Sequence, residues 1–288
     1  MSKLLFKEQS MKKSHDRDYF YKYVTADVAK NILNTLKVRC SSPVLFNDPF
    51  DSQIEIWHNA ESKEDFIKKS TKIICNVLQP LLKNRDTEQN HQFVYNEILK
   101  DKDFVDQRYV AFEKIYKSVN ELICSLLKED RIFCVSETND NLLMWAHYTD
   151  NHKGAVIKLK CIPEKDTALC VAKPVLYSTN MPLLKVEELF NSPQQISRKI
   201  LDEILFTKSL DWQHENEWRV ILMKQQDGCD FDMRGIFEEE LDTIYLGCRI
   251  SESDKKDIAE IVRTKRKNVR IFCARKNDHE FKLDFEEL

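Results

Sequence analysis

The stretch that decides the fold class reads Trp212-Gln213-His214-Glu215-Asn216-Glu217-Trp218-Arg219-Val220-Ile221-Leu222. In an extended strand successive side chains point to opposite faces, so the apolar residues at 218, 220 and 222 share one face. Glu215, Glu217 and Arg219 fall on the other face, which places two carboxylates and a guanidinium in a row. Two interpretations stay open. One is a cross-strand charge ladder that adds little stability. The other is a glutamate that Arg219 keeps ionised, suited to stabilising positive charge in a substrate.

Outside this stretch, short strand-like runs alternate with segments of helical periodicity. Strands are predicted at 19–23, 38–40, 131–136, 155–159, 169–177, 217–223, 243–246, 269–273 and 280–283. Helices are predicted at about 27–36, 141–148 and 184–205, and from Ser251, which forms a capping box with Asp254. This order, without an internal repeat, predicts one α+β domain over residues 19–288 with a largely antiparallel sheet.

Residues 61–130 differ from the sequence on either side. They are rich in Lys, Glu, Asn and Leu, and their apolar residues recur at three and four positions, which predicts a helical insertion. We expect this insertion to recognise a target or a regulator. The alternative is that its apolar residues complete the core. Residues 1–18 are polar and basic and are expected to form a flexible tail.

Composition excludes several classes of protein. The chain has four glycines in 288 residues, where average usage would give about 20, and it contains neither G-x-G-x-x-G nor G-x-x-x-x-G-K-[ST]. A Rossmann cofactor domain and a P-loop NTPase are therefore not expected. None of the nine cysteines stands in C-x-x-C, so we expect reduced, mostly buried thiols and no zinc or other metal site.

Charge and hydropathy point to a soluble protein. The 45 basic and 48 acidic side chains give a formal net charge of −3, so no global field favours a polyanion. The basic run over 263–270 lies at the end of a predicted helix with an acidic first turn, which the helix dipole explains. The sequence has no apolar segment long enough for a signal peptide or a membrane span, which predicts a cytoplasmic protein without membrane contact.

The loop over residues 41–51 is rich in Pro, Asn and Asp, residues that build turns. A plain surface loop explains such a run. If Phe46 and Phe50 anchor the loop on the core, however, Ser42, Asn47 and Asp48 become hydrogen-bonding groups on a stiff frame that lines a site.

A second cluster lies on the predicted helix over 141–148, where Trp145 and Tyr148 share a face and His147 stacks with Leu143. A core-facing aromatic stripe explains the pattern. The alternative is an aromatic pocket that stacks a planar ring, because Trp, His and Tyr each carry a polar atom that needs a partner.

Five sequence blocks together resemble a bacterial family catalogued as domain of unknown function 2971. They are Tyr21-Lys22-Tyr23, Ser42-Pro43 with Phe46 to Asp51, Phe133 with Ser136-Glu137, Met144 to Tyr148 with His152-Lys153-Gly154, and Glu215-x-Glu217-Trp218-Arg219. The blocks keep the family's order and cover roughly residues 19–250. That family is in turn distantly similar to ADP-ribosyltransferases, in which side chains of a split sheet surround NAD.

The similarity implies a role for each block. Lys22 or Tyr21, Ser42 and Glu217 correspond to the three NAD-binding and catalytic positions, and Glu215-x-Glu217 is similar to the E-x-E of arginine-directed transferases. Two features depart from the pattern: the first strand has no His or Arg, and the Ser41-Ser42-Pro43 turn replaces a Ser-Thr-Ser strand.

The chemistry that this resemblance implies is loss of nicotinamide through an oxocarbenium-like transition state. A carboxylate on a ribose hydroxyl binds more strongly as positive charge develops, which assigns Glu217 to this role and Glu215 to orienting the nucleophile. Stacking on the rings of NAD is expected from Tyr21, Tyr23, Trp145 or Tyr148, with His147 beside them. Lys22 and Arg219 are expected near the pyrophosphate.

The resemblance predicts an ADP-ribosyltransferase with NAD as its substrate and a protein or a nucleic acid as acceptor. A toxin or a phage-defence effector fits this activity, with a neutralising or regulatory protein as a second partner. Two other classes stay open. One is a nuclease or phosphodiesterase with Asp48, Asp51, Glu215 and Glu217 around magnesium. The other is a sensor or binding module that keeps the pocket without the chemistry.

Overall fold

The structure is a computed structural model that describes residues 13–52, 55–57, 125–185 and 201–288, and isolated positions between 65 and 123. The chain divides into two compact units. The first comprises Met1–Asp51, Lys128–Thr179 and Lys208–Leu288, and the second Ser52–Leu127 and Asn180–Thr207. In the second unit β3 (Glu55–Trp57) pairs in parallel with β8 (Leu183–Lys185). Most of the predicted insertion over 61–130 lies outside the described residues, as do residues 1–12 of the predicted tail.

The first unit is built on a ten-stranded, mostly antiparallel sheet, so the α+β class with an antiparallel sheet is confirmed. Its main path runs β11-β2-β4-β1-β5-β12-β13-β14; off this path, β10 pairs with β4, and β6 pairs with β10. The bounds are β1 Tyr19–Val24, β2 Lys37–Ser41, β4 Asp130–Ser136, β5 Ala155–Lys160, β6 Lys173–Pro174, β10 Glu217–Met223, β11 Phe231–Gly235, β12 Leu241–Leu246, β13 Arg270–Lys276 and β14 Leu283–Glu287. Among the described strands of this sheet, only β12 and β13 pair in parallel, and helix α8 (Glu252–Lys265) connects them.

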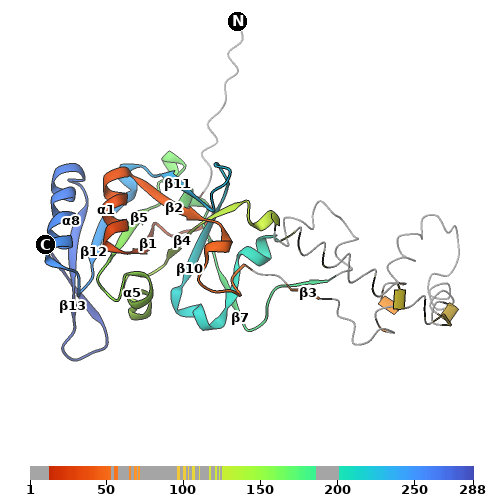
Figure 1. The fold of residues 1–288 in the computed structure, drawn as a ribbon. Helices are drawn as coiled ribbons and strands as arrows, with labels where there is room; N and C mark the ends of the chain where they lie inside the picture. The colour runs from red at the N-terminus through yellow and green to blue at the C-terminus, as the bar shows by residue number, and fades with distance from the viewer. Residues whose placement is uncertain are drawn as a thin grey trace, which may run out of the picture. The chain divides into compact units, whose positions relative to one another are not determined.

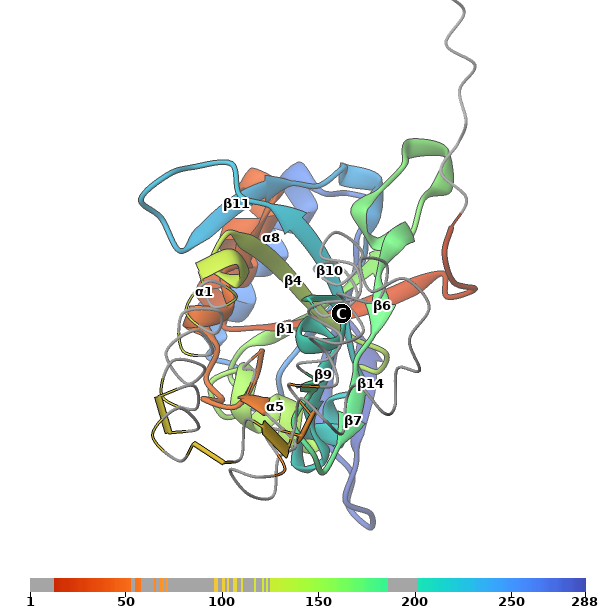
Figure 2. The same ribbon diagram turned by 90° about the vertical axis from the view of Figure 1, so that its right-hand side faces the viewer.

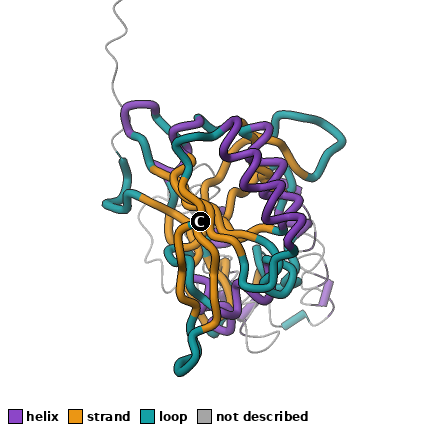
Figure 3. The backbone as a smooth tube through the Cα atoms, turned by 90° about the vertical axis from the view of Figure 1, so that its left-hand side faces the viewer, coloured by secondary structure: helices purple, strands orange, loops and turns teal. Residues whose placement is uncertain are grey.

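Two helices cover one face of this sheet. Helix α1 (Ala26–Thr35) packs against α8, and Lys30 Nζ lies 2.9 Å from Asp254 Oδ1 between them (Figures 1 and 3). Their buried residues Leu33 and Ile258 join Phe20 and Ile157 in the main core. Ser251 caps α8 as predicted, its side chain accepting from the backbone N–H of Asp254.

Helix α5 (Leu142–Tyr148) belongs to a second, smaller core. Asn141 caps it, accepting from the N–H groups of Leu143 and Met144. Trp145 packs there with Tyr23 and Val156, whose sequence neighbours Val24 and Ile157 belong to the main core. Because side chains alternate along β1 and β5, one face of each strand contributes to the main core and the other face to the smaller core.

The sheet splits at β4. On one side β4 pairs with β10 over its whole length, from Ser136↔Glu217 to Asp130↔Met223. Its other partners touch it at one position each: β1 at Tyr21↔Ser136 and β2 at Ser41↔Ile132. Figure 2 shows the direction of β1 diverging from that of β4. Among the described strands, the middle of β4 therefore has no register partner on this side.

Several predicted elements differ from the structure. Residues 169–177 are not one strand, because a 3-10 turn, Ala168–Val171, precedes two short strands, β6 and β7 (Leu176–Ser178). Strand β11 was not predicted. The last strand begins at Leu283, three residues beyond the predicted start. The helix predicted at 184–205 is wrong at its start, where residues 184 and 185 belong to strand β8; residues 186–200 lie outside the described residues, and 201–205 are helical. Among the described helices, none combines the length and the apolar character that crossing a membrane requires.

Candidate functional site

A cavity of about 420 Å³ opens in the first unit where β1 and β2 leave β4. The described residues that line it all belong to that unit and come from β1, β2, β4, α5, the loop over 45–51, and the segment from Lys208 to Glu217. The predicted site residues that line it are Tyr21, Lys22, Tyr23, Asn47, His147, Tyr148, Glu215 and Glu217. Residues far apart in sequence thus meet at the split of the sheet.

A buried ion cluster, formed by Asp51, Lys208, Glu215, Glu217 and Arg219, lies at this cavity. Lys208 Nζ is 2.5 Å from Glu215 Oε2, 3.0 Å from Glu217 Oε2 and 3.6 Å from Asp51 Oδ2. Its three carboxylates and two cations leave a formal charge of −1. Because none of the five side chains is more than 6% exposed, these ion pairs are screened far less than surface pairs.

Arg219 holds two of the carboxylates through forked contacts. Its two terminal nitrogens donate to Asp51 at 2.9 and 2.6 Å, and its Nε and one terminal nitrogen donate to Glu217 at 2.9 and 3.0 Å. A planar guanidinium matches carboxylate geometry in this way, which fixes position as well as charge. Arg219 itself does not line the cavity, so it acts as a positioning residue behind Glu217.

The electrostatics of the cluster keep its members charged. Burial by itself raises the pKa of Glu217, but the charges of Arg219 and Lys208 outweigh it and leave the pKa below the ordinary value. For Lys208, burial lowers the pKa, but Glu217, Glu215 and Asp51 outweigh it and leave the pKa raised. At neutral pH the cluster therefore presents an ionised Glu217 beside a protonated Lys208.

Two tyrosines hold the glutamates in place. Tyr148 donates to Glu215 Oε1 at 2.6 Å, and its pKa is raised by burial and by the negative charge of Glu215. Tyr177 accepts from the backbone N–H of Glu217 at 2.8 Å, and burial raises the pKa of its hydroxyl to about 12. Both hydroxyls therefore stay protonated across the physiological range.

Glu215 reaches the cluster by a different route from the predicted one. It ends a 3-10 helix, Leu210–Glu215, instead of lying on the strand with Glu217. Asn216 then adopts the left-handed conformation (φ 44°), so the chain turns sharply before β10 begins. Ser136 fixes this turn by donating to the Glu215 carbonyl at 2.6 Å. Glu217 and Arg219 share a strand face, as predicted, and both contact the cluster.

Four predicted site residues do not line the cavity, among them Arg219. Ser42 is fully buried and its hydroxyl donates to the Lys128 carbonyl, while its neighbour Ser41 lines the cavity. Trp145 is fully buried, and its indole N–H donates to the Asn139 carbonyl.

The loop over 45–51 also departs from expectation. Asp48 is buried and does not line the cavity; its Oδ1 accepts from the Phe50 N–H. Phe50 is 67% exposed, so it does not anchor the loop. Phe46 lines the cavity, and Arg219 lies over its ring at 5.3 Å.

Lys208 is a residue of the candidate site that sequence reasoning did not identify. It lies on β9 (Thr207–Ser209), which pairs with β7. Its one available signal was its isolation: it is the only charged residue between 204 and 210, a pattern that favours burial with a partner. Arg39, which lines the cavity from β2, was also missed.

A metal centre was the second interpretation of these carboxylates. Among the described residues, no group of three or more His, Cys, Asp or Glu side chains is placed to hold a metal ion. Asp51, Glu215 and Glu217 do converge, but on the ammonium group of Lys208. A protonated lysine thus takes the position that a cation would need in the magnesium hypothesis.

Comparison with known proteins adds one finding. The model of a family described as "Protein of unknown function (DUF2971)" matches residues 144–220, which run from α5 into β10 and contain four of the five cluster residues. No curated protein and no solved structure gives a significant match. The similarity to a family of this description therefore extends over the segment that carries Lys208, Glu215, Glu217 and Arg219.

Proposed function

We propose that the chain is a member of the DUF2971 family with an ADP-ribosyltransferase-like split sheet, and that it transfers ADP-ribose from NAD to a macromolecular acceptor. The observation that carries the proposal is the pairing of Glu215 and Glu217 beside one cavity, with Glu217 kept ionised by Arg219 and Lys208. The opening of the sheet between β1 and β4 also supports it, because split-sheet transferases hold NAD between diverging strands.

The reaction breaks the bond between C1′ of the ribose and the nicotinamide nitrogen. Nicotinamide leaves with the bonding electron pair as a neutral molecule, and positive charge develops on the ribose. A fixed carboxylate stabilises that charge more in the transition state than in the ground state, which is what lowers a barrier. Because Arg219 and Lys208 already fix Glu217, no reorganisation is needed when the charge appears.

The acceptor nucleophile then attacks C1′ and releases a proton. Glu215 is the group we assign to orient it, since Lys208 and Tyr148 each contact one of its oxygens and hold its side chain in place. The products are an ADP-ribosylated acceptor, nicotinamide and a proton, so the charges balance.

NAD binding involves the remaining walls of the cavity. Lys22 donates one hydrogen bond, to the Cys134 carbonyl at 2.7 Å, which leaves two ammonium protons for the pyrophosphate. Arg39 supplies a second cation on the same cavity. Tyr21 offers ring surface for stacking, whereas Tyr23, which is 6% exposed and packs on Trp145, and the fully buried Trp145 no longer figure among the stacking residues. A neutralising protein that covers this cavity would complete the toxin or defence role.

A binding module without turnover is the second candidate. It is favoured by the number of bonds that already engage Glu217, since both its oxygens contact Arg219 and one contacts Lys208. A carboxylate so fully engaged contributes structure even without chemistry.

The test uses the full chain with NAD labelled on its adenine half, in a chelator, with cell protein or nucleic acid as acceptor. Nicotinamide release with transfer of label to acceptor is the result we expect. Saturable NAD binding without release would support the binding module. Cleavage of a phosphate bond that requires added magnesium would support the phosphodiesterase. Absence of both binding and release would overturn the proposal.

A further inference from the structure

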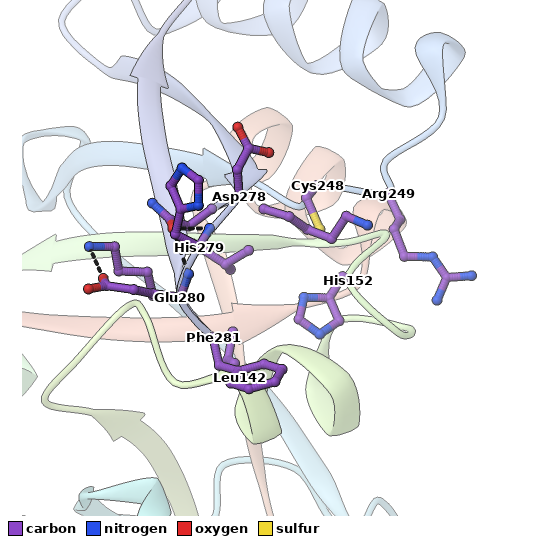
Figure 4. A pocket seen from close by; sticks show the side chains of 12 residues that line it. Leu142, His152, Cys248, Arg249, Asp278, His279, Glu280 and Phe281 are labelled. Carbon is purple, nitrogen blue, oxygen red and sulfur yellow. Dashed lines mark hydrogen bonds and ion pairs between the residues drawn. The ribbon is translucent and has the colours of Figure 1, made fainter.

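A second cavity of the first unit, of about 470 Å³, has a different character from the first. Figure 4 shows it among Leu142 at the start of α5, His152, the turn with Cys248 and Arg249, and the hairpin between β13 and β14. None of these residues belongs to the ion cluster. Helix α5 borders both cavities, because Met144, His147 and Tyr148 line the first one.

The backbone of the wall that carries His152 adopts an energetically unfavourable conformation. Asp150, Asn151 and His152 all have positive φ, at 48°, 56° and 66°, and non-glycine residues rarely adopt this conformation, least of all in succession. Such backbone persists only where the surroundings fix it. Here the His152 N–H donates to the Trp145 carbonyl, and the His152 carbonyl accepts from the Arg249 N–H at 3.0 Å.

Two of the four glycines of the chain stand at this wall. A Cβ atom on Gly247 would lie 2.1 Å from the His152 carbonyl oxygen, and one on Gly154 would lie 2.2 Å from the Val24 oxygen. At both positions another backbone segment therefore lies so close that only glycine, which has no Cβ atom, fits. The residues of the sequence block His152-Lys153-Gly154 do not line the first cavity. Their close backbone contacts in this wall explain why the block has this sequence.

The cavity combines aromatic surface with cations that lack partners. Phe281, at the hairpin tip, is fully exposed, and the His152 ring stacks on Trp145 with centroids 6.1 Å apart and planes 8° apart. Within the described part of the chain, Arg249 and Lys276 have no ion pair, whereas Lys282 pairs with Glu280. Asp278 also lines the cavity, so the unpaired groups sum to a formal charge of +1.

His152 also lines the cavity. Its Nδ1 is buried and has no hydrogen-bond partner among the described residues. Burial, helped by the charge of Arg249, lowers the pKa of His152, so the ring is neutral at physiological pH and its face is suited to stacking.

We propose that this second cavity binds a small anion that carries a planar aromatic or heteroaromatic ring. The ring lies against Phe281 and His152, and the anionic group lies on Arg249 and Lys276. The volume fits such a ligand, since small-molecule sites usually measure about 300–1,000 Å³. Binding at this second cavity does not require NAD turnover at the first cavity.

Calorimetric titration of the full chain with adenosine monophosphate and with phenylacetate tests the proposal. Adenosine and inorganic phosphate serve as probes that carry only the ring or only the anion. We expect a ring-bearing anion to bind saturably and more tightly than either half. Arg249→Ala with Lys276→Ala should weaken binding by about tenfold or more, because charge-assisted hydrogen bonds contribute on this order. Phe281→Ala should weaken it without a change in melting temperature, since the ring is fully exposed.

The matched control is Lys256→Ala with Arg263→Ala, which removes two exposed charges from α8 and should leave binding unchanged. Binding of adenosine monophosphate alone identifies a nucleotide as the ligand, and binding of phenylacetate identifies a simple aromatic acid. Absence of saturable binding, or binding that the Arg249 and Lys276 variant leaves intact, overturns the proposal. Binding lost in Lys22→Ala instead would assign the ligand to the first cavity and also overturn it.

Discussion

Two buried glutamates of the first unit, Glu217 and Glu240, have pKa values that are shifted in opposite directions. Glu217 is 6% exposed and Glu240 is 3% exposed, so both lose nearly all contact with water. Arg219 and Lys208 hold the pKa of Glu217 below its ordinary value. Glu240 caps a 3-10 turn (Glu238–Glu240) by accepting from the Phe237 N–H, and burial raises its pKa to about 7.

The opposite pKa shifts of the two glutamates come from the groups that contact their carboxylates and not from the depth of burial. A backbone N–H satisfies one oxygen of Glu240 but supplies no full positive charge. The guanidinium of Arg219 and the ammonium group of Lys208 supply a full positive charge at Glu217, so the ionised form of this glutamate is favoured. A buried carboxylate that stays ionised beside a cavity is suited to chemistry on a developing cation, whereas Glu240 titrates near neutrality as part of a cap.

The largest expected effect comes from removing the guanidinium. Arg219→Met leaves Asp51 and Glu217 buried with only Lys208 between them, and breaking a buried pair of this kind costs about 3–5 kcal/mol. The free energy of unfolding from denaturant titration measures it. Arg270→Met is the control, since the loss of the exposed, solvent-screened Arg270–Glu287 pair should change stability little. Equal effects of the two variants would contradict the account of the cluster.

Glu240→Gln tests the glutamate whose pKa is raised by burial. Because the folded pKa is raised, the proton on Glu240 stabilises the fold below the unfolded pKa, and that stability is lost as pH rises through about 7. Glutamine mimics the protonated form, so the variant should exceed the wild type by about 2–3 kcal/mol in unfolding free energy at pH 8. The two should be equal near pH 4. Glu239→Gln, at an exposed neighbour that pairs with Lys165, should show no such gain in stability at pH 8.

Lys22→Ala tests the wall of the first cavity. It removes an ammonium group that donates to the Cys134 carbonyl and, in our proposal, to the pyrophosphate. We expect NAD affinity to fall by about tenfold, or about 1.4 kcal/mol. Titration calorimetry measures the change. Lys37→Ala, an exposed lysine of β2 outside the cavity, should bind NAD as the wild type does. An unchanged affinity in Lys22→Ala would remove Lys22 from the NAD site.

The sequence predicts those parts of the site that depend on local periodicity. Glu217 and Arg219 share a face because strand side chains alternate, and β1, β4 and β10 lie where their apolar patterns indicate. Ser42 shows the limit of this reasoning. A difference of one position decides which serine faces the cavity, and the structure places Ser41 there.

Other features depend on tertiary contacts that no local pattern encodes. Lys208 meets Glu217 nine residues later only because a 3-10 helix and the left-handed Asn216 intervene. Trp145 and Tyr148 lie on one helix, but periodicity alone does not decide which of them faces a core and which a cavity. The close approach at Gly247 depends on His152, almost a hundred residues away.

Nicotinamide release from NAD by Glu217→Gln tests whether the ionised carboxylate of Glu217 takes part in the proposed reaction. The measurement is made in a chelator, at equal folded fractions set by circular dichroism, beside Glu137→Gln, a partly exposed glutamate that pairs with Arg17 outside the cavity. We predict that the wild type and Glu137→Gln release nicotinamide at similar rates. Glu217→Gln should be slower by about 100-fold or more, because it loses the charge that stabilises the transition state. Release by Glu217→Gln at the wild-type rate would contradict the account.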